Sequence, residues 1–190
     1  MTSVTILLLS LGCLALGDAG LDNQWQCLET RYTIIRYKSF GDLHKFNEKI
    51  EYGRAPWKVN QLFSSGDSGN LIGHIEEKVD KLLERVQGIL DMHILKRKIN
   101  INLYSNKNEL YAAYPMNWGS TSRYYKTSSI PRAWYVYERN TIYINTDDLH
   151  DGILAHEVAH AIIDNYLLVR PPKETAEILA RYVGSQVRDD

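Results

Sequence analysis

The sequence lacks the features that would place the chain in several specialised classes of protein. It has no excess charge of either sign: 22 lysines and arginines stand against 23 aspartates and glutamates. A dedicated nucleic-acid-binding protein normally carries a basic excess or a basic stripe, so we expect no nucleic-acid partner. No segment repeats at a fixed period. With 44% hydrophobic and 24% charged residues, the composition is that of a globular protein and excludes wholesale disorder.

Apolar runs of membrane length are also missing. The longest uncharged apolar run covers residues 4–16, which is 13 residues, whereas about 20 are needed to cross a bilayer. This length fits the apolar core of a secretory signal peptide, and Ala15-Leu16-Gly17 predicts cleavage before Asp18. We therefore expect residues 1–17 to be a signal peptide and the protein to be exported, periplasmic or secreted. A lipoprotein modified at Cys13 and a buried N-terminal helix are the alternatives.

Cysteine is nearly absent, with two in the whole chain. Cleavage before Asp18 would leave Cys27 alone, and one cysteine cannot form an internal disulfide. Residues 18–190 must then be held together by their hydrophobic core or by a metal. We find no convincing boundary within them and expect a single domain with no further membrane span.

The hydrophobic pattern predicts alternating strands and helices. Strands are expected at 29–37, 98–104, 133–137 and 141–144, and helices at 40–52, 71–90, 108–114, 149–168 and 173–187. Residues 115–131 form a loop of mixed polar and aromatic character, either a substrate rim or an ordinary surface loop. The order predicts an α+β fold in which a small mixed β-sheet packs against helices.

One motif carries clear chemistry: His156-Glu157-Val158-Ala159-His160 lies inside the penultimate predicted helix. Residues four apart share a helix face, so both imidazoles can reach the same zinc ion. Glu157 lies beside them, where it can act as general base on a water whose pKa zinc has lowered. The helix is apolar almost all round, and buried polar groups are costly unless something pairs with them. A zinc ion bound by these groups would offset the free-energy cost of burying them.

A zinc site of this kind needs a third protein ligand. The extended metzincin motif would place a glycine and a histidine where Ile163 and Tyr166 stand, and no histidine follows His160. Asp164, on the same helix, is expected to orient a ligand histidine or to face solvent.

The final helix supplies the better candidates, Glu174 and Glu177. At 100° per residue, Glu177 lies about 100° from the centre of the apolar face and Glu174 about 160° from it. Small residues, Ala180 and Gly184, share the flank of Glu177, as close approach to another helix requires. Glu174 has a simple explanation as an acidic residue in a first helical turn. The geometry favours Glu177.

The sequences HEVAHAIIDNY at 156–166 and AEILARYV at 176–183 resemble the gluzincin metallopeptidases, more narrowly the bacterial peptidase-MA-like proteins. The resemblance is strong over 141–187 and looser back to Glu29. It implies a zincin-like fold, in which a helix with HExxH is followed by a C-terminal glutamate helix. It also implies one zinc ion per chain, bound by His156, His160 and Glu177.

Two features depart from that family's pattern. Ile178 stands where a glycine is usual, and the chain ends thirteen residues after Glu177. We therefore expect a compact protein without the helical subdomain that supplies a second cleft wall and an oxyanion-stabilising group in larger gluzincins. The candidates for that group in this chain are His150, Tyr124, Tyr125, Tyr166 and Tyr182.

The sequence thus predicts a zinc-dependent metallopeptidase that acts on a peptide or protein substrate, with Glu157 as its catalytic base. One alternative is a zinc-bound but non-catalytic binding or interaction domain of the cell envelope. An intact Glu157 argues against it, because structural zinc needs no general base. The other alternative is a metal-free structural or interaction protein in which the motif is a coincidence.

Overall fold

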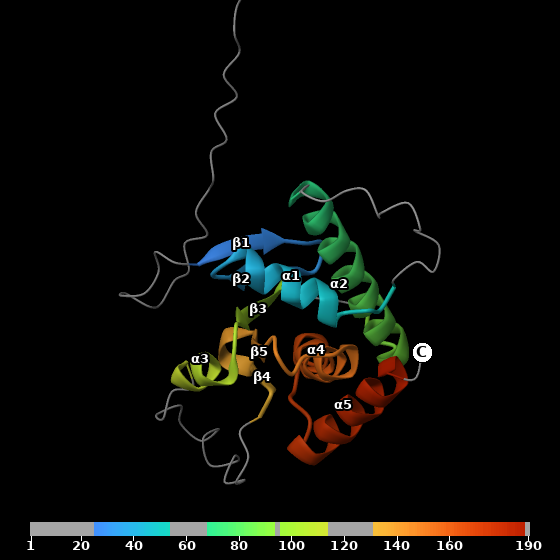
Figure 1. The fold of residues 1–190 in the computed structure, drawn as a ribbon. Helices are drawn as coiled ribbons and strands as arrows, with labels where there is room; N and C mark the ends of the chain where they lie inside the picture. The colour runs from blue at the N-terminus through green and yellow to red at the C-terminus, as the bar shows by residue number, and fades with distance from the viewer. Residues whose placement is uncertain (1–24, 54–67, 94–95, 114–130, 189–190) are drawn as a thin grey trace, which may run out of the picture.

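A five-stranded mixed sheet organises the computed structural model, which describes residues 25–53, 68–93, 96–113 and 131–188 (Figure 1). The strands are β1 (Gln26–Glu29), β2 (Thr33–Tyr37), β3 (Ile99–Tyr104), β4 (Ala133–Val136) and β5 (Thr141–Asn145). Their order is β1-β2-β3-β5-β4, with parallel β2, β3 and β5 between antiparallel edge strands β1 and β4. The predicted α+β class and mixed sheet are confirmed. The expected signal peptide and the loop at 115–130 lie outside the described residues.

Five α-helices accompany the sheet in the described part of the chain. They are α1 (Phe40–Lys49), α2 (Ser68–Leu90), α3 (Lys107–Ala112), α4 (Asp151–Tyr166) and α5 (Lys173–Arg188). Each predicted helix is present in the predicted order, with ends that differ by a few residues. Within the described residues, none of these helices combines the length and the apolar character that a membrane span requires.

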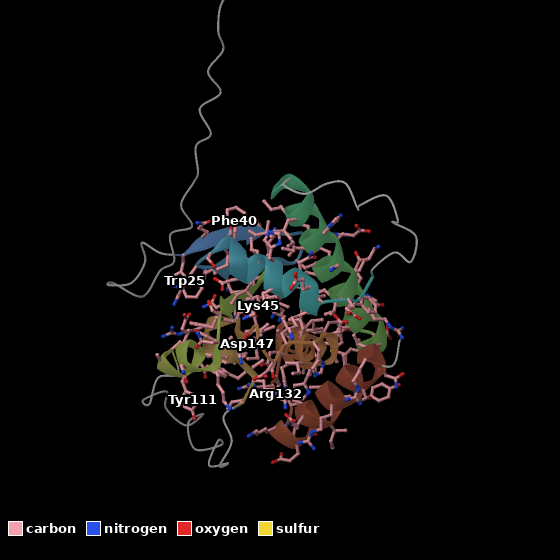
Figure 2. All side chains as sticks on the ribbon, viewed as in Figure 1. Trp25, Phe40, Lys45, Tyr111, Arg132 and Asp147 are labelled. Atoms are coloured by element: carbon pink, nitrogen blue, oxygen red, sulfur yellow. The ribbon has the colours of Figure 1, made fainter. Side chains whose placement is uncertain are left out.

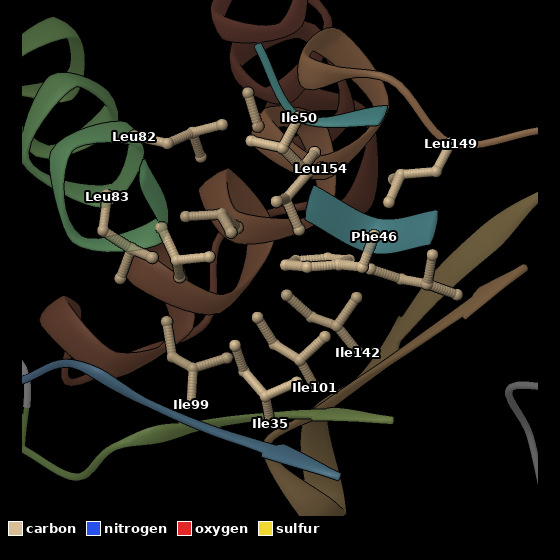
Figure 3. Packing of buried hydrophobic residues seen from close by; sticks show 14 of the residues in the cluster. Ile35, Phe46, Ile50, Leu82, Leu83, Ile99, Ile101, Ile142, Leu149 and Leu154 are labelled. Carbon is tan, nitrogen blue, oxygen red and sulfur yellow. The ribbon is translucent and has the colours of Figure 1, made fainter. Parts of the chain in front are cut away.

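The main core lies between one sheet face and the helices α1, α2, α4 and α5. Alternate strand residues such as Ile35, Ile101 and Ile142 point to this face, where Phe46 of α1 and Leu154 of α4 meet them (Figure 3). Burying each such side chain stabilises the folded state by about 1.5–3 kcal/mol. A smaller aromatic cluster, which includes Leu110 of α3, covers part of the other face. The helix with the HExxH motif is therefore fixed against the sheet.

The strand predicted at 29–37 begins too early, because residues 30–32 form a turn and β2 covers only Thr33–Tyr37; the strand before this turn, β1, was not predicted. The Thr30 hydroxyl accepts hydrogen bonds from the backbone N–H groups of Tyr32 and Thr33 and donates to Asp80 of α2. Threonine favours such turns by offering the backbone a local hydrogen-bond partner. The added strand β1 pairs antiparallel with β2.

A group of side-chain hydrogen bonds joins the β4–β5 connection to the C-terminal end of α4. A short 3-10 turn (Tyr137–Arg139) leads to Asn140, whose φ of 47° lies in the left-handed region that asparagine tolerates. The Asn140 side chain accepts hydrogen bonds from Asn165 and from the Tyr135 hydroxyl, and donates to the Lys98 carbonyl. The expected β4–β5 hairpin is confirmed, and it holds the C-terminal end of α4.

Polar contacts also fix the N-terminal end of α4. Lys45 of α1 pairs with Asp147 in the segment that leads from β5 into α4 (Figure 2). Asp151, in the first turn of α4, accepts a hydrogen bond of 3.1 Å from the backbone N–H of Glu51. Both ends of α4 are thus tied to neighbouring elements, which limits how the motif residues can move.

Candidate metal centre

The helix α4 presents its histidines at the edge of the core. Its fully buried residues, among them Leu154, Val158 and Ile162, face the main core, as the apolar sequence predicts. The side chains of His156 and His160 are 23% and 20% exposed. They are therefore less buried than the apolar stripe around them suggested, because they turn towards α5. This position leaves them within reach of solvent and of a ligand.

Two glycines let α5 approach α4 very closely. A Cβ atom built on Gly184 of α5 would lie 2.8 Å from the carbonyl oxygen of Gly152, and one on Gly152 would lie 2.8 Å from that of Gly184. Any side chain at either position would force the helices apart. The expected role of Gly184 in close helix packing is confirmed. This crossing brings the Glu177 flank of α5 to the histidines of α4.

The structure brings His156, His160 and Glu177 together, and their candidate ligand atoms all lie within 4.8 Å of one another. The Nε2 atoms of the two histidines are 3.3 Å apart. Glu177 Oε2 lies 3.4 Å from His160 Nε2, and Glu177 Oε1 lies 3.7 Å from His156 Nε2. Glu174, the other candidate, is exposed and belongs to no such cluster among the described residues.

These distances fit a single zinc ion. Ligand atoms arranged tetrahedrally about 2.0–2.1 Å from one zinc ion lie about 3.3–3.4 Å from each other. Two imidazole nitrogens and a carboxylate oxygen also form a typical catalytic donor set, which leaves a fourth position open. The residues present therefore fit a zinc ion in both spacing and chemistry.

Groups around the three candidate ligands hold them in place. The Arg181 guanidinium donates from Nε to Glu177 Oε1 over 2.9 Å, which leaves Oε2 turned towards His160. The ring of His156 is hydrogen-bonded to the backbone of Ala180 in α5. Such outer partners orient metal ligands and are typical of metal sites in proteins.

The electrostatics keep the candidate ligands in the protonation states that a metal needs. Burial and the neighbouring His156 lower the pKa of His160 to about 4, and burial lowers the pKa of His156 as well. Burial acts to raise the pKa of Glu177, but both histidines and Arg181 outweigh it and bring the value below the usual range. Near neutral pH the cluster therefore holds two neutral imidazoles and one carboxylate.

Glu157 is the most buried charged residue of the motif. Its carboxylate accepts a hydrogen bond from the backbone of Tyr135 in the edge strand β4. Burial, followed by repulsion from Glu177, nevertheless raises the pKa of Glu157 to about 8. A carboxyl group whose pKa lies near neutrality is matched to taking up and releasing a proton.

Asp164 does not have either role expected from the sequence. Its side chain is only 5% exposed, and Arg170 donates to its carboxylate over 3.1 Å. This ion pair links the last turn of α4 to the segment before α5. Asp164 therefore serves the α4–α5 connection rather than facing solvent.

The five residues predicted as candidates for oxyanion stabilisation differ in where they lie in the structure. Tyr166 and Tyr182 are exposed, and Tyr124 and Tyr125 lie outside the described residues. His150 caps α4, accepting from the backbone N–H of Ile153, and lines the same cleft as His156 and Glu157. Of the described candidates, His150 is thus the one that lines this cleft.

A cleft with a volume of about 380 Å³ opens beside the cluster. Besides His150, His156 and Glu157, its lining includes three arginines, Arg132, Arg181 and Arg188. These arginines were not predicted from the sequence. Arg181 and Arg188 follow Glu177 and Gly184 at steps of three and four residues, so all four share one face of α5. This spacing could have predicted that both arginines lie near Glu177. Arg132 precedes β4 and gave no such signal.

The chain matches no protein-family model, and comparisons with curated proteins and with solved structures give no match either.

Proposed function

We propose that this chain is an exported, zinc-dependent metallopeptidase of gluzincin type with a zincin-like fold. The observation that carries the proposal is the convergence of His156, His160 and Glu177 on one point, with Glu157 buried in the adjoining cleft wall. A metal site that served structure alone would need the three ligands but no buried carboxylate in the cleft wall beside them.

Each residue has a distinct part in the proposed reaction. A zinc ion held by His156, His160 and Glu177 would supply Lewis-acid chemistry, namely polarisation of a peptide carbonyl and a lower pKa for water. The Glu157 carboxylate accepts the proton of the attacking water and then delivers it to the leaving amine nitrogen. His150 is the candidate donor to the oxyanion, because it lies in the same cleft.

Removal of zinc is expected to abolish hydrolysis of a broad peptide library, and addition of zinc to restore it. The reason is that the protein residues alone offer no strong nucleophile in the described cleft. Mass spectrometry of the digested library measures this and also gives the cleaved bonds. Hydrolysis that survives complete zinc removal would contradict the proposal. No hydrolysis by the zinc-loaded protein would favour a non-catalytic binding domain.

A further inference from the structure

The cleft beside the metal cluster concentrates positive charge. Among the residues that the structure describes, its lining contains Arg132, Arg181 and Arg188 and a single acidic residue, Glu157. The chain as a whole carries a net charge of −1, so this excess is local to the cleft. A concave site lined by charges of one sign attracts ligands of the opposite sign.

The three arginines are not equivalent. Arg181 is held by Glu177 and so belongs to the candidate metal centre. Arg132 forms no ion pair with a carboxylate of the described residues. It enters the cleft from the start of β4, whereas Arg188 enters it from the last turn of α5.

Contacts and charges around His150 indicate that Arg132 and Arg188 lie in the same part of the cleft. A Cβ atom built on Gly152 would lie 3.3 Å from His150 Cε1 and 3.4 Å from Arg188 Cβ, so both side chains pass over this glycine. Burial lowers the pKa of His150, and the charges of Arg132 and Arg188 lower it further. Both guanidinium groups therefore act on the same imidazole.

We propose that Arg132 and Arg188 form a subsite that binds a carboxylate of the substrate beside the metal cluster. Guanidinium groups pair with carboxylates through two parallel N–H donors, which gives strength and direction. This inference rests on the proposed function, since a peptide is the expected substrate. A peptide offers a carboxylate either at its C-terminus or on an aspartate or glutamate side chain.

The volume of the cleft suits this role. Ligand sites commonly span about 300–1,000 Å³ and combine apolar walls with a few placed polar groups. Here Ala133, Gly152 and Ile153 line the cleft together with the arginines and the motif residues. A substrate anchored by its carboxylate would extend past His156 and Glu157.

The test measures peptide binding and peptide hydrolysis separately on the full chain loaded with zinc. Binding is measured by fluorescence anisotropy with the Glu157→Gln variant, which is not expected to cleave its ligands. One pair of labelled peptides differs only in a free or amidated C-terminus, and a second, amidated pair differs only in an internal glutamate or glutamine. The pair that shows a difference identifies the source of the carboxylate.

We expect the peptide with the bound carboxylate to lose about tenfold or more in affinity when that group is neutralised, since hydrogen bonds between charged groups have this strength. When each is combined with Glu157→Gln, Arg132→Gln and Arg188→Gln should each lower the affinity for that peptide by a similar factor. The affinity for its neutral counterpart should stay unchanged. The control is Arg97→Gln, at the opposite end of the sheet, before β3. It should change nothing.

Equal affinity for acidic and neutral peptides in the Glu157→Gln protein would overturn the inference, and that comparison needs no arginine variant. If the parent still cleaved peptides in that case, the proposed function would stand without the subsite. Arginine-dependent binding of acidic peptides without any cleavage would support the subsite and contradict the peptidase. Neither binding nor cleavage would overturn both.

Discussion

Replacing Glu157 by glutamine is expected to lower kcat for peptide hydrolysis by about 10²- to 10⁴-fold while the zinc content stays at one per chain. Glutamine has the shape of glutamate but cannot accept a proton from the attacking water. Glu157 is not part of the cluster that His156, His160 and Glu177 form, so its replacement should leave the metal bound. Kinetics with the best-cleaved library peptide, together with elemental analysis, measure both effects.

The matched control for this variant is Glu174→Gln. Glu174 is an exposed glutamate in the first turn of α5, outside the cluster, and its replacement should change neither turnover nor zinc content. Unchanged hydrolysis in Glu157→Gln would refute the proposed mechanism. A loss of zinc in the same variant would show that Glu157 acts on the metal rather than on the reaction.

Replacing Gly184 by alanine is expected to damage both the fold and the metal centre. The new Cβ would lie 2.8 Å from the Gly152 carbonyl oxygen and 3.4 Å from His156 Cβ, and a backbone oxygen cannot move away cheaply. We expect the free energy of unfolding to fall by about 1–3 kcal/mol, as in other overpacked sites. The shift of α5 would carry Glu177 and Ala180 away from the histidines, so zinc affinity should fall by about 10- to 100-fold.

Gly88→Ala is the control for the glycine substitution, because Gly88 lies in α2 and a Cβ atom there meets nothing within 4 Å. It should raise the free energy of unfolding by about 0.5–1 kcal/mol, since alanine favours a helix over glycine. Denaturant unfolding of the zinc-free proteins and zinc competition with a chelator measure the two effects. A Gly184→Ala protein that matches the parent in both would show that the close helix crossing is not needed.

The parts of the fold that follow from local pattern were predictable from the sequence. The amphipathic spacing within α2 and the apolar run around the motif in α4 predicted both helices, because burial of one face dominates their stability. Glu177 was favoured over Glu174 because it lies closer to the apolar face of the helix that became α5. The structure places Glu177 at the histidines.

Other features depended on contacts that the local pattern does not contain. The strand β1 was not predicted, and the strand predicted from Glu29 to Tyr37 ran through the turn that precedes β2. The turn at Thr30 depends on a hydroxyl that bonds to the backbone and to Asp80, which lies fifty residues away. The role of Asp164 was misjudged for a similar reason, because its partner Arg170 follows a change in chain direction after α4.

The arginine cleft illustrates the same limit at the functional site. Arg132 and Arg188 are 56 positions apart and come from a strand start and a helix end. Only the packing of α5 against α4 and the position of β4 at the sheet edge bring them to one cleft. Sequence spacing predicted the candidate ligands that share helix faces but not the groups that converge from different elements.

The most direct test of the central claim is the zinc content of the chain purified without added metal, measured by elemental analysis. We expect about one zinc per parent chain, a clear loss in Glu177→Ala and no loss in Glu174→Ala. This pattern would establish that His156, His160 and Glu177 hold the metal. No zinc in the parent even after reconstitution, or full zinc retention in Glu177→Ala, would contradict the account.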